Sequence, residues 1–269
     1  MVLASPPALL RPYVREYTGW IEHMASPLCR RELPTEVVPV IFNFGAPIRI
    51  FDRRDPSRWT SFNTFSTGAY DTHVLVGSAG PSSGLQVNFT ILGARLFFGH
   101  PLSGLTNRVV PLEDLVGASA HVLTHRLRDP ASWDARFAIV DEEIERRFAM
   151  SRAVCSEVTW AWERLYGTRG RVRVGGLVDD IGWSQKHLIA RFRDEFGLPP
   201  KVLGRVLRFG HAVSVIKRSG GIRFADLAAQ CGYFDQAHFS RDVHQFAGVS
   251  PTELVKSLLP DQGGFQVDL

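Results

Sequence analysis

The sequence predicts an α+β protein with two domains. Short segments with a strand-like period of two fill the first part of the chain, where 12 of the 16 prolines fall within the first 130 residues. Two helical patterns follow, divided by Asp129-Pro130. From about Ala153 onward the pattern is helical, with no strand signal. We expect a β-rich, barrel-like domain that ends in a helix pair (1–150), an all-α domain (153–257) and a tail (258–269).

The clearest strand signal is LQVNFTIL, residues 85–92, in which apolar and polar residues alternate. This alternation is typical of a half-buried antiparallel strand. Gly, Pro, Asp and Ser turns separate the other predicted strands, which are residues 37–44, 48–51, 62–67 and 73–76. The helix pair is predicted at residues 112–127 and 131–148.

Composition favours a soluble globular protein, since 45% of the 269 residues are hydrophobic and 22% are charged. No run of 18 apolar residues predicts a transmembrane helix, and the N-terminal stretch lacks the pattern of a signal peptide. We therefore expect a cytoplasmic protein without a membrane partner. The three cysteines, Cys29, Cys155 and Cys231, lie far apart in the sequence and argue against a disulfide framework.

Positive charge is concentrated in the C-terminal part. Residues 153–257 carry 15 Lys and Arg against 10 Asp and Glu, whereas residues 1–152 carry 16 against 15. An excess of positive charge is expected in a domain that binds a polyanion. Charge alone does not distinguish a nucleic-acid-binding protein from an enzyme with a basic half.

A helical pattern over residues 224–251 is interrupted at Gly232 and stops again at Gly248. Glycine readily adopts the left-handed conformation that ends a helix, and Asp235 can cap the following helix by accepting a backbone N–H bond. Phe239 and Val243, four residues apart, give that helix a buried stripe. The segment predicts two short helices joined by a tight turn, a helix-turn-helix unit.

Residues 175–200 repeat this plan about 50 residues earlier, with Gly182 at the break, Ser184 as the cap and one residue fewer in the turn. Residues 201–221, between the two units, have the pattern of a single linker helix. Such a helix can hold two equivalent units at a fixed separation, facing successive major grooves roughly 34 Å apart.

Residues 153–257 resemble the DNA-binding domain of the AraC/XylS family of bacterial transcription regulators. The resemblance is carried by GWSQKHLIARFRDEFGLPP in the first unit and IRFADLAAQCGYFDQAHFSRDVHQFAGVSP in the second. The N-terminal half, through ILGARLFFGHPLSGLTNRVVPLEDLVG and the helix pair, is similar to sensory domains of one uncharacterised branch of that family. The resemblance implies a sequence-specific, effector-responsive regulator of transcription, more often an activator that contacts RNA polymerase than a repressor.

The resemblance also implies which residues meet double-stranded promoter DNA. The positions that face bases are Lys186, Ile189 and Ala190 in the first unit and Gln236, Ala237, His238 and Arg241 in the second. Lysine and arginine can donate to guanine and glutamine can pair with adenine, whereas Ile189 and Ala190 depart from the polar residues often found there. Basic side chains are candidates for phosphate contacts: Arg173, Arg191, Arg193, Lys217, Arg218 and Arg223.

Two other functions stay open at this point. Ile189 and Ala190 motivate a regulator with a weakened DNA reader that acts mainly through protein–protein contacts. An enzyme is the other, because the same helical module occurs fused to DNA alkyl-transfer repair domains. That chemistry needs a nucleophilic thiolate, usually within a cysteine cluster, and the three cysteines form none in sequence. We therefore expect no enzymatic activity and no cofactor.

The N-terminal half gives weaker signals. A cupin-type metal site can be imagined, but its spacing matches no firm pattern and we expect no metal; its residues would be His23, His73, His100, Glu32 and Glu36. No effector-binding residue can be identified. The apolar stripe Phe137, Val140, Ile144 and Phe148 forms either the seam of a homodimer or a contact with the protein's own sheet.

Overall fold

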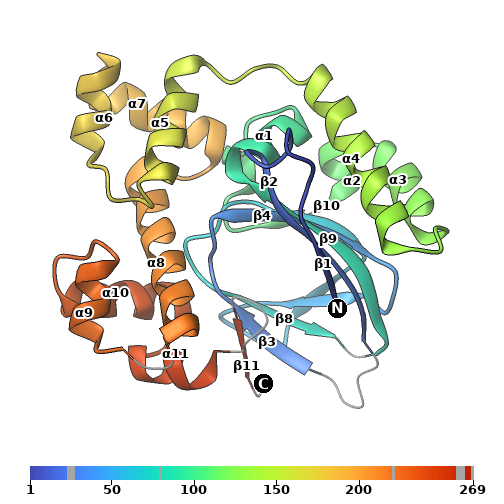
Figure 1. The fold of residues 1–269 in the computed structure, drawn as a ribbon. Helices are drawn as coiled ribbons and strands as arrows, with labels where there is room; N and C mark the ends of the chain where they lie inside the picture. Colours follow the sequence, from blue (N-terminus) through green and yellow to red (C-terminus); the bar gives the residue numbers. More distant parts are fainter. Residues whose placement is uncertain (23–27, 79, 220–221, 259–263, 268–269) are drawn as a thin grey trace.

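The structure is a computed structural model that describes residues 1–22, 28–78, 80–219, 222–258 and 264–267. Two sheets and their covering helices form the N-terminal part, and the C-terminal part is a set of helices beside it (Figure 1). The α+β fold class is confirmed.

The first sheet has six strands in the order β1–β2–β9–β4–β7–β10, and every neighbouring pair is antiparallel. The strand predicted at residues 85–92 is β9 as far as Thr90, whereas Ile91 and Leu92 already belong to the following helix; β9 pairs with β2 on one side and β4 on the other. The strands are β1 (Val2–Ala4), β2 (Val14–Glu22), β4 (Val37–Asn43), β7 (Thr64–Thr67), β9 (Ser82–Thr90) and β10 (Val109–Pro111).

The second sheet has five strands in the order β11–β3–β8–β5–β6, again antiparallel. They are β3 (Leu28–Glu32), β5 (Ile48–Phe51), β6 (Trp59–Phe62), β8 (Val74–Ser78) and β11 (Gly264–Gln266). The segment predicted as one strand at 62–67 is divided between the two sheets, in β6 and β7. The β-rich domain is thus confirmed, but its two sheets face each other across a cavity and do not close into a barrel.

Helices cover one face of the first sheet: α1 (Ile91–Phe98), the single-turn η1 (Ser103–Leu105), α2 (Leu112–Val116), α3 (Ser119–Arg128) and α4 (Trp133–Met150). The helix predicted at 112–127 is two helices, because Gly117 at φ +67° ends α2. On α4, Ile144 is fully buried and Phe137 stacks on Tyr17 of β2 with ring centroids 5.5 Å apart. The apolar stripe of α4 therefore packs on the protein's own sheet.

The C-terminal helices are α5 (Ser156–Gly167), α6 (Val174–Ile181), α7 (Gln185–Phe196), α8 (Pro200–Ser219), α9 (Phe224–Gln230), α10 (Gln236–Ala247) and α11 (Pro251–Ser257). Figure 1 shows α8 as the long element that connects α6–α7 at one end to α9–α10 at the other. This is the predicted pair of helix-turn-helix units on a linker helix.

The tail corrects one expectation. A strand after residue 153 was not predicted, yet β11 pairs antiparallel with β3, with Phe265 opposite Arg31. Phe265 is 3% exposed and belongs to the same apolar cluster as Phe209 of α8 and Leu33, which follows β3. The C-terminal segment therefore returns to the β-rich part and joins its second sheet.

Packing also crosses the predicted boundary at 150–153. One buried cluster runs from the first sheet through Ile144 of α4 to Leu188 and Phe192 of α7. The side chains of Arg95 on α1 and Glu195 on α7, 4% and 6% exposed as residues, form an ion pair with an N–O distance of 2.6 Å. The first helix-turn-helix unit is thus fixed against α1 by both apolar and charged contacts.

Candidate DNA-binding surface

The first unit is formed by α6 and α7. Gly182 has φ +77°, and its N–H donates to Val178 at the end of α6. Only glycine adopts this left-handed conformation without a Cβ penalty, so the chain can turn here at once. Ser184 then caps α7 by accepting from the N–H of His187 at 3.2 Å. Leu188 is fully buried and fixes the rotation of α7 about its axis.

The second unit, α9 and α10, is built in the same way. Gly232 has φ +78°, and Asp235 caps α10 by accepting from the N–H of His238 at 2.6 Å. Phe239 and Val243 are fully buried, and Gly248 at φ +70° ends the helix. The local features predicted for this segment are therefore confirmed.

An aromatic contact recurs in both units. Trp183 lies edge-on against His187 with ring centroids 4.4 Å apart, and Tyr233 lies edge-on against His238 at 5.2 Å. In each case the aromatic residue that follows the left-handed glycine packs on a histidine in the first turn of the second helix. This contact sets the direction in which each second helix leaves its turn.

The linker helix α8 holds the second unit through charged contacts. Arg205 pairs with Asp242 of α10 at 2.6 Å, and Asp242 is 1% exposed. The same guanidinium also donates to Gln245 at 2.7 Å and lies over the Phe246 ring. Asp242 was not singled out in the sequence, because its role depends on an arginine 37 residues away. These contacts hold α10 against α8.

The seven predicted base-facing residues lie on two helices, three on α7 and four on α10. Lys186, Ala190, Gln236, Ala237 and Arg241 are exposed, whereas Ile189 and His238 are half-buried. The structure thus groups the predicted residues on the accessible faces of α7 and α10. Phe234, in the turn before α10, was passed over in the sequence although its side chain is 93% exposed.

The predicted phosphate contacts lie around these helices. Arg173, Arg193, Lys217, Arg218 and Arg223 are exposed. Arg191 differs, because its guanidinium lies 3.6 Å from Glu195, the buried partner of Arg95. Arg191 therefore takes part in the contact between α7 and α1 as well as facing solvent.

The β-rich part also contacts the second unit. The Arg31 guanidinium on β3 donates to the carbonyl of Ala247 at the C-terminal end of α10, at 2.9 Å. His73, just before β8, lies close to Gly248, the cap of the same helix. Burial, and then the nearby charges of Arg31 and Arg53, lower the pKa of His73 to about 4. Sequence analysis missed this contact, because nothing local in β3 points to a helix more than 200 residues away.

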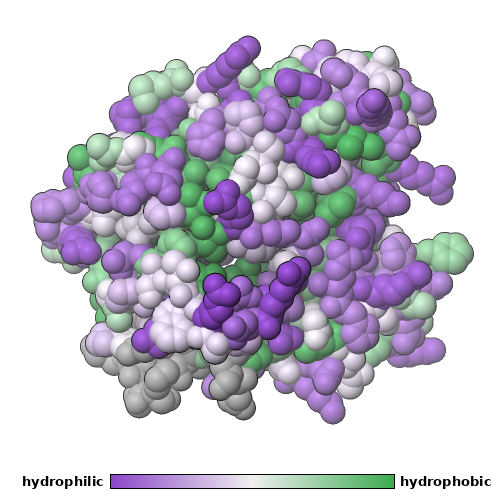
Figure 2. Space-filling model, turned by 180° about the vertical axis from the view of Figure 1, so that it is seen from behind, coloured by the Kyte–Doolittle hydropathy of each residue, from purple (hydrophilic) through white to green (hydrophobic). Residues whose placement is uncertain are grey.

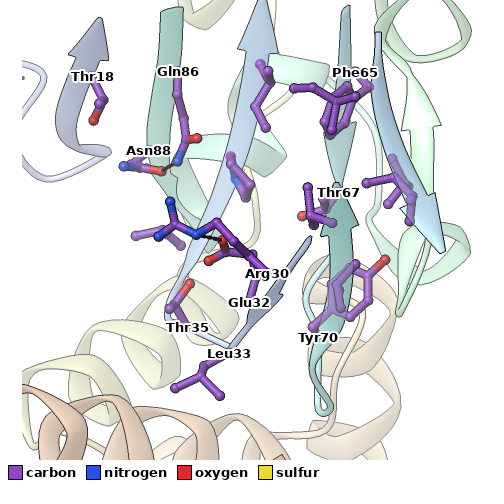
Figure 3. Close-up of a pocket in the computed structure, with 18 of the residues that line it drawn as sticks. Thr18, Arg30, Glu32, Leu33, Thr35, Phe65, Thr67, Tyr70, Gln86 and Asn88 are labelled. Carbon is purple, nitrogen blue, oxygen red and sulfur yellow. Dashed lines mark hydrogen bonds and ion pairs between the residues drawn. The ribbon is translucent and has the colours of Figure 1, made fainter. Parts of the chain in front are cut away.

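A cavity of about 400 Å³ lies between the two sheets of the β-rich part. Figure 3 shows side chains of both sheets converging on it, with Thr18, Gln86, Asn88, Phe65 and Thr67 from the first sheet and Arg30 and Glu32 from β3 of the second. Seen from behind, the molecule is mostly hydrophilic at its surface, and apolar residues gather near the middle of that face (Figure 2).

The described residues contain neither a cluster that could hold a metal ion nor a helix that could span a membrane. No group of three or more His, Cys, Asp or Glu side chains in this part of the chain is placed to hold a metal ion. Of the imagined cupin-type set, His23 lies outside the described residues. None of the helices described is both long and apolar enough to cross a bilayer.

Comparison with known proteins gives two family matches. Residues 177–257 match a family model described as a helix-turn-helix domain, and residues 3–111 match one described as a domain of unknown function. No curated protein sequence matches the chain.

Solved structures give more distant matches. ToxT from Vibrio cholerae O395 is 10% identical, with 89% of this chain and 97% of ToxT covered and a TM-score of 0.49. Wild-type ToxT from Vibrio cholerae strain SCE256, solved with a bound unsaturated fatty acid, is 10% identical over 93% of this chain and 97% of that one, with a TM-score of 0.48. The C-terminal domain of AraT, a response regulator from Geobacillus stearothermophilus, is 19% identical over 39% of this chain and 88% of its own, with a TM-score of 0.36.

Proposed function

We propose that the chain is a transcription regulator of the AraC/XylS family and that it binds promoter DNA sequence-specifically through α7 and α10. The observation that carries the proposal is the pair of capped second helices, each with an exposed outer face and a buried inner one. Exposed lysine, glutamine and arginine side chains supply the donors and acceptors that base edges in the major groove recognise. Such a protein works in the cytoplasm, where bacterial promoter DNA lies.

The two units differ in what they offer to bases. In the second, Gln236 and Arg241 are exposed and can each make two hydrogen bonds to one base. In the first, Ile189 is half-buried and Ala190 carries no hydrogen-bonding group, so only Lys186 can donate. We therefore expect the second unit to supply most of the base specificity and the first to add phosphate contacts and thymine-methyl contacts.

The test is selection of bound fragments from a genomic library by the full chain at about 50 and 200 mM salt. We expect a small set of enriched sites at both concentrations, with affinity falling steeply as salt rises because binding releases counterions. A double variant, Gln236→Ala with Arg241→Ala, is the matched control and should lose the enrichment. If the wild-type chain enriches no fragment, the alternative of a weakened DNA reader that acts through protein contacts is favoured.

The cavity between the sheets supports a small-molecule effector as the signal. Arg30 and Glu32 of β3 line the cavity, and Arg31, which lies between them in the strand, contacts the end of α10. A ligand in the cavity would therefore touch the same strand that contacts the second unit. Binding of RNA polymerase and of a second copy of the chain remain part of the proposal. Since the apolar stripe of α4 is covered by its own sheet, any homodimer would use another surface.

A further inference from the structure

The cavity has one polar wall, formed by neighbouring positions on β2 and β9. Glu16 lies opposite Asn88 and Thr18 opposite Gln86 in the register of the two strands. Gln86 donates to Asn88 at 2.7 Å, and Asn88 donates to a carboxylate oxygen of Glu16 at 3.2 Å. The three side chains form one hydrogen-bonded row whose last member is a carboxylate.

Thr18 is the second feature of this wall. It is 4% exposed, it lines the cavity, and its hydroxyl has no hydrogen-bond partner. A buried hydroxyl without a partner is costly, and in a native structure each such group calls for an explanation, such as a bound water, ion or ligand. Thr18 lies on the same wall as Gln86 and Asn88 (Figure 3), and this marks the place where a polar group of a ligand would be held.

The charges on the cavity wall are mostly negative. Among the described lining residues, Glu16, Glu22 and Glu32 carry carboxylates, whereas Arg30 carries a guanidinium and Met1 carries the N-terminal ammonium group. Arg30 lies 3.2 Å from Glu32, so its charge is balanced by a neighbour on the same strand. The excess of carboxylates disfavours an anion in the cavity and favours a cation.

The remaining walls are mostly apolar, with a few hydroxyl-bearing side chains such as Thr67 and Tyr70. They are formed mainly by Ile41, Ile48, Ile50, Phe65 and Val76, which come from β4, β5, β7 and β8. An apolar lining with a few convergent polar groups is the usual composition of a small-molecule site. A ligand that fits has an apolar body and a polar end directed at β2 and β9.

From this arrangement we infer that the cavity binds an amine or an alcohol on an apolar skeleton, with the amine preferred, and discriminates against carboxylates. The ammonium or hydroxyl donates to Glu16, and the Thr18 hydroxyl completes its hydrogen bonds. The inference rests on the proposed effector-responsive function, whose site it specifies. By this inference the cavity disfavours a fatty acid, because the polar end of a fatty acid is a carboxylate.

The test uses three probes with one skeleton, 4-phenylbutylamine, 4-phenylbutan-1-ol and 4-phenylbutanoate, titrated calorimetrically into the full chain at pH 7. We expect the amine to bind at least about tenfold more tightly than the carboxylate, with the alcohol between them. A carboxylate that binds as tightly as the amine, or no binding by any probe at millimolar concentration, overturns the inference.

Substitutions test which side chains of the cavity cause the preference for the amine. Glu16→Gln keeps the acceptor for Asn88 but removes the charge, so the amine should lose about tenfold in affinity while the alcohol is unchanged. Thr18→Val should weaken the amine and the alcohol by a similar factor. Glu163→Gln, an exposed position on α5 away from the cavity, is the charge-matched control and should change neither. Equal losses in Glu16→Gln and Glu163→Gln would overturn the assignment of Glu16.

DNA binding by wild type and variants is measured separately, without probe. A chain that binds the probes as expected but enriches no DNA contradicts the proposed regulator function and leaves the ligand class standing. A chain that binds specific DNA but prefers the carboxylate contradicts the ligand class alone.

Discussion

Arg31 caps the C-terminal end of α10, the second helix of the second helix-turn-helix unit, from a different part of the chain, donating to the carbonyl of Ala247 at 2.9 Å. The last carbonyls of a helix lack partners within the helix, and the negative end of its dipole attracts a cation. The Arg31 guanidinium also lies over the ring of Phe265, 5.3 Å from its centroid, on the returning strand β11. One side chain thus joins β3, β11 and the second helix-turn-helix unit.

Replacing Arg31 by alanine should therefore destabilise the protein. A hydrogen bond from a charged donor is worth about 1.5–3 kcal/mol, so we expect Arg31→Ala to lower the free energy of unfolding by roughly that amount, measured by urea denaturation. Arg49→Ala is the control: Arg49 stacks on Trp59 of the neighbouring strand and should change stability by about 0.5 kcal/mol or less. Equal effects of the two substitutions would contradict a capping role for Arg31.

The buried pair of Arg95 and Glu195 gives a second prediction. Arg95→Met leaves the buried Glu195 carboxylate with only the longer contact to Arg191, so unfolding should become easier by about 3–5 kcal/mol. The double variant, with Glu195→Met added, removes the buried charge and should recover most of that loss, as measured by chemical denaturation. If the double variant is as unstable as Arg95→Met, the loss arises from packing and not from the unpaired charge.

His73 gives a prediction on pH. Its pKa is lowered to about 4 in the folded protein from the ordinary 6.5, by burial and then by the charges of Arg31 and Arg53. Between these two pH values the unfolded chain binds a proton that the folded chain does not. Protonation of His73 in the unfolded chain therefore lowers the free energy of unfolding as the pH falls from 6.5 toward 4, whereas above pH 6.5 His73 has no such effect.

The measurement compares melting temperatures of wild type and His73→Gln from pH 7.5 to 4.5. Other titrating groups act on both proteins, so the difference between the two curves isolates His73. We expect wild type to lose more stability than the variant across the window. Parallel curves would show that His73 does not couple folding to protons.

The helix-turn-helix units were predictable from sequence because their signals are local. The positive φ of Gly182 and Gly232 and the caps from Ser184 and Asp235 each act within four residues of the turn they control. The outward residues of α7 and α10 were placed by resemblance, and their roles at DNA stay predictions until binding is measured.

Strand β2 was missed for a physical reason. Its middle is buried on both faces, with Thr18 toward the cavity and Tyr17 under α4, where its hydroxyl donates to Asp141. A strand covered on both sides need not alternate between apolar and polar residues. Gly19 completes the run, because a side chain there would collide with the Trp133 ring.

Strand β11 and the contacts across residue 150 could not be read from sequence either. Three residues are too few for a periodic signal, and the pairing of Phe265 with Arg31 depends on the fold of the whole chain. The boundary predicted at 150–153 remains a prediction. With Glu195 and Leu188 packed against the β-rich part, we expect a fragment of residues 153–269 to be less stable than the full chain.

Phe239→Ala tests the inner face of α10. Phe239 is fully buried among Phe224, Tyr233 and its apolar neighbours. Removing a buried aromatic side chain costs about 3–5 kcal/mol, so this variant should unfold at markedly lower urea concentration and bind all DNA sequences poorly. Unchanged stability would mean that Phe239 does not face the core and that another face of α10 is buried.

Arg241→Ala tests the outer face of the same helix. Arg241 is exposed two residues after Phe239, so its side chain is free to meet a base edge, and its removal should leave the urea midpoint unchanged. An arginine that makes two hydrogen bonds to guanine O6 and N7 is worth about 1–3 kcal/mol of discrimination. We therefore expect a loss of roughly ten- to hundredfold in affinity for selected sites, with relaxed preference at one base pair. Lys256→Ala, at an exposed position of α11, removes the same charge and is the control. A uniform loss on every sequence would identify Arg241 as a phosphate contact, and lost stability with intact base preference would make it structural.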